Sequence, residues 1–301
     1  MEEEIIVYSF SDDQATVKRI NFQIVSDILE IPASVMHDNK EYKVTEILNN
    51  AFHRVDISTL ILPITIEKIG YSVFYSQKIT ELYIPDLLSW MQIDFEEYFE
   101  ATGNTHFFYS YANPIRPYTR FFIDGIELKN TLTIPEEISV IKPRTFQYLN
   151  IEKLILGENV TEIGKQAFSN CENLNIIEFK KNLKKIGNQA FECCTSLLEL
   201  NLPEGVEYIE TGAFNNCSNL VTLTLPSTLL FFDCNLEGCD SLSSISLYCE
   251  KPPLISEYSF GPPTEVAQRV TIYVPENSVS LYETAPFWRL FENIRPIEGK
   301  R

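Results

Sequence analysis

The sequence predicts a β-rich, right-handed repeat solenoid whose coils of about 23 residues contain short strands and tight turns. Three features recur in phase along the chain. An Ala-Phe pair ends at Phe168, Phe191 and Phe214, in steps of 23 residues. A cysteine follows each pair after three residues, and a leucine follows each cysteine after three more. Because all three features keep one period, each repeat is expected to fold as one coil.

Each coil is expected to contain a first short strand. Two apolar residues flank one outward residue in Leu154-Ile155-Leu156, in Leu200-Asn201-Leu202 and in Leu223-Thr224-Leu225. This alternation is the period-2 pattern of a strand with one buried face. Pro203 and Pro226 follow two of these strands and end them, since proline cannot donate a ladder hydrogen bond.

A second apolar pair follows the first strand in every coil, as in Val160 with Ile163 and Leu183 with Ile186. Gly164 and Gly187 come next, and we expect them to allow the tight turn into the Ala-Phe segment. One coil cannot bury both faces of its strands. The core must therefore form by stacking coils at the spacing of neighbouring strands.

Weaker copies of the pattern extend toward the N-terminus and define the domains. A degenerate first repeat begins near residue 28, and the polar stretch 37–41 within it is predicted to form a hairpin turn. We divide the chain into an N-terminal β cap with this first repeat (1–56), a solenoid (57–249) and a C-terminal capping segment (250–301). An aromatic-rich insertion at 86–130 interrupts the solenoid.

The repeats resemble the BspA-type leucine-rich repeat, whose consensus is roughly Leu-x-x-Leu-x-Ile-Pro-x-x-Val-x-x-Ile-Gly-x-x-Ala-Phe-x-x-Cys. Residues 197–217 fit this consensus closely, and nearly the whole chain is similar to the family. Glu210 departs from it where a glycine is expected, and residues 227–238 lack the Ala-Phe pair. The resemblance implies a leucine-rich-repeat solenoid. It also implies a role in binding or adhesion, as in surface or secreted proteins of host-associated bacteria.

The composition argues against binding to nucleic acids and membrane surfaces. The chain has 42 acidic and 24 basic residues, and its formal net charge of -18 repels phosphate backbones and anionic lipids. No apolar run approaches the length of a membrane-spanning helix, so no membrane insertion is expected. The first residues, Met1-Glu2-Glu3-Glu4, lack the features of a secretory signal. This leaves a cytosolic protein or a trimmed mature chain.

No catalytic, cofactor or metal site is expected from the sequence. The histidines lie in no hydrolase or zinc motif, and no glycine-rich nucleotide loop is present. The cysteines follow the repeat and include no CxxC pair of the kind that binds metals. We interpret them as small buried residues at one corner of each coil and expect them to stay reduced, above all in the ladder Cys171, Cys194, Cys217 and Cys239.

Two surfaces are candidates for binding. The first is the row of outward side chains on successive first strands, although a merely solvated sheet face is the simpler interpretation. This row comprises Lys153, Ile155, Ile176, Glu178, Glu199, Asn201, Thr222, Thr224, Ser244, Ser246 and Tyr248. The second is the aromatic insertion, which could instead form a small core of its own. Its candidate contact residues are Tyr98, Phe107, Tyr109 and Tyr111.

The function that we expect is non-enzymatic binding or adhesion to a macromolecule of a host or cell surface, with a protein or glycan ligand. We expect a monomer at the cell surface or secreted from the cell. An alternative from another class is a scaffold for partner proteins in the cytoplasm or periplasm. A third hypothesis places a glycan-active module in the aromatic insertion.

Overall fold

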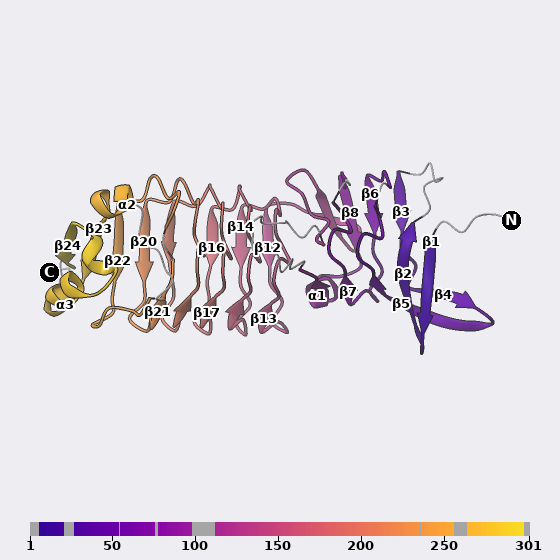
Figure 1. The fold of residues 1–301 in the computed structure, drawn as a ribbon, viewed down its shortest axis with the longest axis horizontal. Coiled ribbons are helices and arrows are strands. Elements are labelled where there is room, and N and C mark those ends of the chain that lie inside the picture. The colour runs from indigo at the N-terminus through magenta and orange to yellow at the C-terminus, as the bar shows by residue number, and fades with distance from the viewer. Residues whose placement is uncertain are drawn as a thin grey trace, which may run out of the picture. The chain divides into compact units, whose positions relative to one another are not determined.

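The chain folds as a β-solenoid with coils of about 23 residues, as the sequence predicts (Figure 1). The computed structural model describes residues 6–20, 27–53, 55–75, 78–97, 112–234, 236–255 and 264–297. The chain divides into two compact units, Met1–Lys129 (unit 1) and Asn130–Arg301 (unit 2). The predicted division into caps, solenoid and insertion stays a prediction.

Unit 1 has two rows of strands. Its first strand row has the order β11-β10-β8-β6-β3 and consists of β3 (Ile28–Glu30), β6 (Thr59–Ile61), β8 (Glu81–Ile84), β10 (Arg120–Ile123) and β11 (Ile126–Leu128). The second strand row has the order β1-β2-β5-β7-β9 and consists of β1 (Ile6–Ser11), β2 (Gln14–Ile20), β5 (Lys40–Ile47), β7 (Lys68–Ile69) and β9 (Asp94–Phe95). β4 (Ser34–His37) pairs antiparallel with β5, and this pair is the hairpin that the sequence predicts.

The described strands of the predicted insertion belong to coils of unit 1. β9 pairs parallel with β7 in the second row, and β10 pairs parallel with β8 in the first row. Between them lies the short helix α1 (Leu87–Gln92), whose N-cap residue Asp86 accepts a hydrogen bond from the Ser89 backbone N–H. Trp90 of this helix is buried, and its ring centroid lies 5.2 Å from that of Phe95 and 5.3 Å from that of Phe121. These rings fill the coil.

Unit 2 repeats the same plan with more regular coils. Its first strand row consists of β12 (Thr131–Thr133), β14 (Lys153–Ile155), β16 (Ile176–Glu178), β18 (Glu199–Asn201), β20 (Thr222–Leu225), β22 (Ser244–Leu247), β23 (Thr271–Val274) and β24 (Asn293–Pro296). Its second row consists of β13 (Val140–Ile141), β15 (Glu162–Ile163), β17 (Lys185–Ile186), β19 (Tyr208–Ile209) and β21 (Phe231–Phe232). All of these strands pair in parallel.

The repeated residues form ladders inside unit 2. Phe146, Phe168, Phe191 and Phe214 are fully buried, and successive rings stack with centroids 5.5, 5.5 and 6.0 Å apart. Each cysteine of the predicted ladder is buried, and its thiol donates to the backbone carbonyl of a phenylalanine on the preceding coil at 3.2–3.3 Å. All seven cysteines are free thiols. The ladder therefore has the packing role that the sequence predicts.

Gly164 and Gly187 are required for a reason other than the tight turn that the sequence predicts. Neither Gly164 nor Gly187 has a positive φ, so the turn itself does not require glycine there. A Cβ at Gly164 would lie 2.7 Å from the Ile141 carbonyl oxygen, and one at Gly187 would lie 2.8 Å from that of Ile163. These glycines are needed because the backbones of neighbouring coils approach closely. The left-handed turn position two residues later is occupied instead by Gln166 and Gln189.

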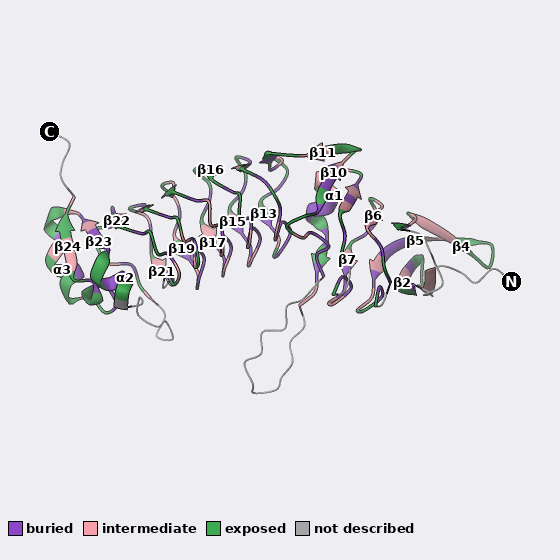
Figure 2. Cartoon of the chain, turned by 90° about the horizontal axis from the view of Figure 1, so that it is seen from above, coloured by how far each residue is buried: buried purple, intermediate pink, exposed green. Residues whose placement is uncertain are grey.

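The C-terminal segment covers the last coil of unit 2. It contains α2 (Thr264–Arg269), the 3-10 turn η1 (Glu276–Ser278), α3 (Val279–Thr284) and the 3-10 turn η2 (Trp288–Leu290). Tyr282 and Trp288 are buried, and they donate hydrogen bonds to the carbonyls of Cys249 (3.1 Å) and Pro253 (3.3 Å). Figure 2 shows the buried residues along the coils and the exposed ones in turns, in hairpins and on the C-terminal helices. No helix in the described part of the chain is long and apolar enough to cross a membrane.

Candidate binding surface on the first strand row

Parallel pairing brings the predicted binding residues into lines across the first strand row of unit 2. Outward residues alternate with buried ones, so each strand carries two outward side chains. Across the strands these side chains form two parallel lines. On β14 and β16, Lys153 pairs with Ile176, and Ile155 pairs with Glu178. On β18, β20 and β22, one line runs through Glu199, Thr222 and Ser244, and the other through Asn201, Thr224 and Ser246. All of these side chains are exposed or half-buried.

The row consists of two sheets and is not continuous. β12-β14-β16 form one sheet, and β18-β20-β22-β23-β24 form another. The break follows Phe179, which occupies the place of Leu156 and Leu202 in neighbouring coils. Its larger ring packs edge-on against Phe191, with centroids 6.2 Å apart. A bulkier inward side chain thus accompanies the loss of pairing, while the second strand row stays continuous through β15, β17 and β19.

The N-terminal part of this row uses its charges internally. Lys153 Nζ lies 2.5 Å from Glu178 Oε1. The hydrogen bond and charge of Lys153 lower the pKa of the Glu178 carboxyl. Beside this pair, Ile176 is 50% exposed and Ile155 is half-buried. This part of the row is a mixed surface in which the ionic groups are already partnered.

The C-terminal part of the row has hydroxyl groups without partners. Among the described residues, the hydroxyls of Thr222, Thr224, Ser244 and Ser246 make no hydrogen bond to another protein group. Hydroxyls elsewhere on the coils behave differently. Ser243, one residue before Ser244, donates to the Val221 carbonyl at 3.1 Å. The side chains of the strand hydroxyls stand away from the sheet, whereas the backbone carbonyls of these strands lie in the sheet and bond to neighbouring strands.

The structure adds residues to this surface that sequence reasoning assigned to the cap. β23 pairs with β22 and β24 pairs with β23, so the first strand row continues through the C-terminal segment. Thr271 and Tyr273 extend the two lines of outward residues, followed by Asn293 and Arg295. The sequence pattern of a first strand is present in 271–275, where apolar residues alternate and a proline follows, as in other first strands.

We call the outward residues on β20, β22 and β23 the hydroxyl row. Its members are Thr222, Thr224, Ser244, Ser246, Thr271 and Tyr273. Tyr248 lies just after β22, and its side chain is 48% exposed. The ring of neither tyrosine contacts another aromatic ring in the described part of the chain. The hydroxyl row, with Tyr248 beside it, therefore offers unpaired donors and acceptors together with two tyrosine rings.

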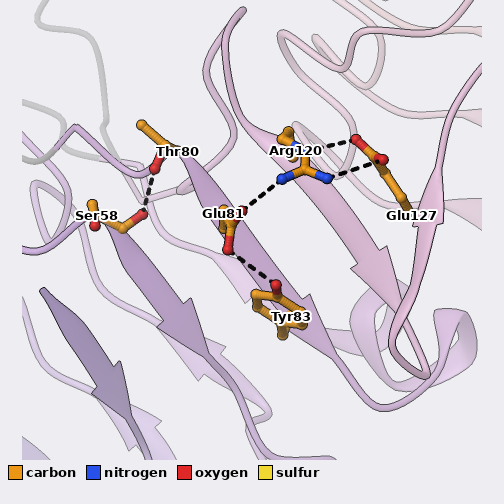
Figure 3. A network of polar contacts seen from close by, with 6 residues as sticks. All are labelled: Ser58, Thr80, Glu81, Tyr83, Arg120 and Glu127. Atoms are coloured by element: carbon orange, nitrogen blue, oxygen red, sulfur yellow. Dashed lines mark hydrogen bonds and ion pairs between the residues drawn. The ribbon is translucent and has the colours of Figure 1, made fainter.

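The outward face of the first row in unit 1 carries a closed polar network (Figure 3). Arg120 bridges two carboxylates, with its Nη1 2.7 Å from Glu81 Oε1 and its Nε 2.8 Å from Glu127 Oε1. Tyr83 donates its hydroxyl to Glu81 Oε2 at 3.0 Å. The hydrogen bond from Arg120 lowers the pKa of the Glu127 carboxyl, and the hydrogen bond to Glu81 raises the pKa of the Tyr83 hydroxyl.

Aromatic stacking completes this unit 1 network. The rings of Tyr83 and Phe122 are parallel, with centroids 4.3 Å apart, and the Arg120 guanidinium lies 4.9 Å from the Phe122 centroid. Sequence reasoning did not predict this network. Because its members already bind one another, the network offers a ligand fewer unpaired groups than the hydroxyl row does.

The second candidate surface is the aromatic insertion. Tyr98, Phe107, Tyr109 and Tyr111 lie outside the described residues, so their role stays a prediction. Within the described part of the chain, no group of three or more His, Cys, Asp or Glu side chains is arranged to hold a metal ion.

A family model for the BspA type leucine-rich repeat region matches residues 8–112 and 118–243, in six copies. The chain belongs to the BspA-type leucine-rich repeat family. The two matched ranges together cover most of the chain, in both units. No match was found among curated proteins.

Solved leucine-rich repeat structures resemble this BspA-type chain at low sequence identity. A leucine-rich repeat protein from Bacteroides ovatus is 16% identical, with a TM-score of 0.54, over 99% of this chain and 76% of that one. The pneumococcal vaccine antigen PcpA is 15% identical, with a TM-score of 0.49, over 99% and 98%. A leucine-rich cell surface protein from Faecalibacterium prausnitzii is 16% identical, with a TM-score of 0.39, over 82% and 94%. The likeness to the first supports the fold alone.

Proposed function

We propose that this BspA-type chain is a non-enzymatic recognition module that binds a macromolecule of a cell or host surface, at the cell surface or outside the cell. The observation that carries this proposal is the hydroxyl row, whose side chains lie in two lines on adjacent coils and have no partner among the described residues. Solenoids commonly bind partners through such extended, repeated surfaces.

The environment of the cysteines supports a binding role over a catalytic one. The thiol is the side chain in the repeats with the greatest potential as a nucleophile, but only as a thiolate. Burial raises the pKa of Cys234 to about 11 and that of Cys239 to about 12, so both thiols stay protonated at neutral pH. Burial also raises the pKa of Cys194 and Cys217 well above the usual value. Their chemistry is that of packing groups.

The proposal is tested by blocking the hydroxyl row with large charged side chains. A Thr224→Arg/Ser246→Arg variant would be compared with a Val140→Arg/Tyr208→Arg variant, whose changes lie at exposed positions of the second strand row of the same unit. Both variants and the unchanged chain would be applied to an array of extracellular matrix proteins and cell-surface glycans. Circular dichroism would establish that each variant is folded.

We expect the unchanged chain to bind at least one arrayed molecule, and the row variant to lose at least about 90% of that signal, because interface centres tolerate buried charge poorly. The second-row variant should bind as the unchanged chain does. Equal loss in both variants, or full binding by the row variant, would remove the first strand row of unit 2 as the recognition surface.

A further inference from the structure

The geometry of the hydroxyl row allows its ligand to be specified further, on the basis of the proposed function. The five-stranded sheet β18-β20-β22-β23-β24 aligns outward side chains in two lines that run across the coils. One line passes through Thr222, Ser244 and Thr271, and the other through Thr224, Ser246 and Tyr273. Neighbouring strands are about 4.8 Å apart. Polar groups thus repeat along the stack at a fixed short interval.

The chemistry of this array favours an uncharged polar ligand. Every member of the hydroxyl row is neutral, and each hydroxyl can both donate and accept a hydrogen bond. A polyanion would need a cluster of cations. One line instead runs from Glu199 to Asn293 and the other from Asn201 to Arg295, so Arg295 is the one cation on them, in a chain of net charge -18. An apolar ligand would cover the hydroxyls and leave them without partners, which is unfavourable.

An extended peptide would gain little from this face. Peptides commonly add to a sheet through the unpaired backbone of an edge strand. β20, β22 and β23 are each paired with a strand on both sides, so their backbone groups are already used. Only side chains remain available on the face. A ligand that matches them must carry its own donors and acceptors at short, regular intervals, as the hydroxyls of a sugar chain do.

The two tyrosines supply the second element of sugar recognition. Tyr273 pairs across strands with Ser246, and Tyr248 is two residues beyond Ser246 on the same side of its strand. The rings are amphipathic, with an apolar face and a polar hydroxyl. The C–H face of a pyranose ring can stack on such a surface while its hydroxyls reach the neighbouring serine and threonine side chains. In unit 1, by contrast, Tyr83 is already stacked on Phe122.

We propose that the hydroxyl row binds an extended, uncharged polysaccharide that lies along the stack, so that successive sugars meet successive coils. Each pyranose lengthens an extended sugar chain by about the spacing between neighbouring strands. Successive sugars can therefore stay aligned with successive coils. Tyr248 and Tyr273 stack on sugar rings, and the serine and threonine hydroxyls bond to the sugar hydroxyls.

The test uses the full chain and linear hexasaccharides of glucose, mannose, galactose and N-acetylglucosamine, with the corresponding disaccharides, in titration calorimetry. Hexagalacturonate serves as the charged comparison. The first variant, Thr222→Val/Thr224→Val/Ser244→Ala/Ser246→Ala, removes hydroxyls with little change in shape. Its matched control is Thr131→Val/Thr133→Val on β12, which lies in the other sheet of the row. The second variant is Tyr248→Ala.

We expect at least one neutral hexasaccharide to bind more tightly than its disaccharide and than hexagalacturonate. The four-hydroxyl variant should weaken binding about tenfold or more, since several hydrogen bonds are lost, and the β12 control should not change it. Tyr248→Ala should weaken it about fivefold. No binding of any neutral oligosaccharide, or binding that the four-hydroxyl variant leaves unchanged, would overturn the glycan assignment.

Failure of this inference is distinguishable from failure of the proposed function. If the chain binds a matrix protein, and Thr224→Arg/Ser246→Arg abolishes that binding while no neutral glycan binds, the row is a protein-binding surface and only the glycan assignment is wrong. If neither arginine nor valine substitutions in the row affect any binding, both proposals are wrong.

Discussion

The outward faces of the first strand row differ between the two units, although the coils beneath them follow one plan. In unit 1, Glu81, Arg120 and Glu127 bind one another, and Tyr83 stacks on Phe122. In unit 2, the hydroxyl row lies in the same position of the coil, and its side chains have no partner among the described residues. The difference follows from side-chain length, because long side chains reach across neighbouring strands and short hydroxyls do not.

The outward face of the first strand row therefore has two different proposed roles, stability in unit 1 and ligand binding in unit 2. Side chains that pair with one another contribute to the stability of their unit, and substitutions among them should appear as a loss of folding free energy. Side chains that remain unpaired contribute little to stability and are free for a ligand. The chain also offers a means to follow each unit separately, since Trp90 lies in unit 1 and Trp288 in unit 2, and there is no other tryptophan.

The largest expected difference between the units is their response to alkaline pH, because all seven cysteines belong to unit 2. Burial raises the pKa of Cys239 from 9.0 to about 12. The stabilisation from such a thiol is complete below the unfolded pKa of 9.0 and is lost as the pH rises through about 12. At pH 10 the loss is on the order of 1 kcal/mol for each buried thiol, and roughly several kcal/mol for the ladder.

This prediction is measured by urea unfolding at pH 7 and pH 10, with tryptophan fluorescence in a Trp90→Phe background that reports on unit 2. Cys239→Ala should reduce the difference in unfolding free energy between pH 7 and pH 10 by roughly 1 kcal/mol. A Trp288→Phe background reports on unit 1, where no thiol contributes. Equal alkaline destabilisation of both units, unaffected by Cys239→Ala, would show that the thiols do not cause it.

The next effect concerns Phe122, whose side chain is only 8% exposed although it lies on the outward face of unit 1. Phe122→Ala removes the ring that packs against Tyr83 and Arg120, and we expect the free energy of unfolding of unit 1 to fall by about 3 kcal/mol. Urea unfolding with Trp90 as the reporter measures this change. Thr224→Ala in unit 2 is the matched substitution. A loss under about 1 kcal/mol for Phe122→Ala would contradict the idea that this face stabilises its unit.

Much of the fold, but only part of this comparison, could be predicted from the sequence. The period of Phe168, Phe191 and Phe214 identifies the coil, since one repeat cannot bury its own core. The continuation of the row through β23 was missed because 250–270 interrupts the period before Thr271. The network of unit 1 was missed for another reason. Arg120 and Glu81 are 39 residues apart, and only stacking brings them together.

A smaller effect is expected from Arg120, because all members of its ion network lie at the surface and are screened by solvent. Arg120 lowers the pKa of Glu127, so this carboxylate contributes stability above its unfolded pKa, and the contribution is lost as the pH falls through the lower folded pKa. Arg120→Gln should therefore lower the melting temperature of unit 1 at pH 7 and low salt, and less so at pH 3 or in 1 M salt. Thermal unfolding followed through Trp90 tests this. A decrease that is independent of pH and salt would indicate lost packing on Phe122 instead.

The smallest effect on stability is expected in the hydroxyl row, where substitutions should have the largest effect on binding. Thr222→Val and Thr224→Val replace unpaired hydroxyls by methyl groups on an exposed strand face, and valine favours strands as threonine does. Each should change the free energy of unfolding of unit 2 by less than about 0.5 kcal/mol, measured through Trp288. Thr119→Val in unit 1 is the contrasting substitution, since the buried Thr119 hydroxyl donates to the Ile79 carbonyl at 2.6 Å. It should cost about 1–2 kcal/mol, because that carbonyl loses its partner. If the two row substitutions cost as much as Thr119→Val, the row hydroxyls must be paired within the folded chain, and they would not be free for a ligand.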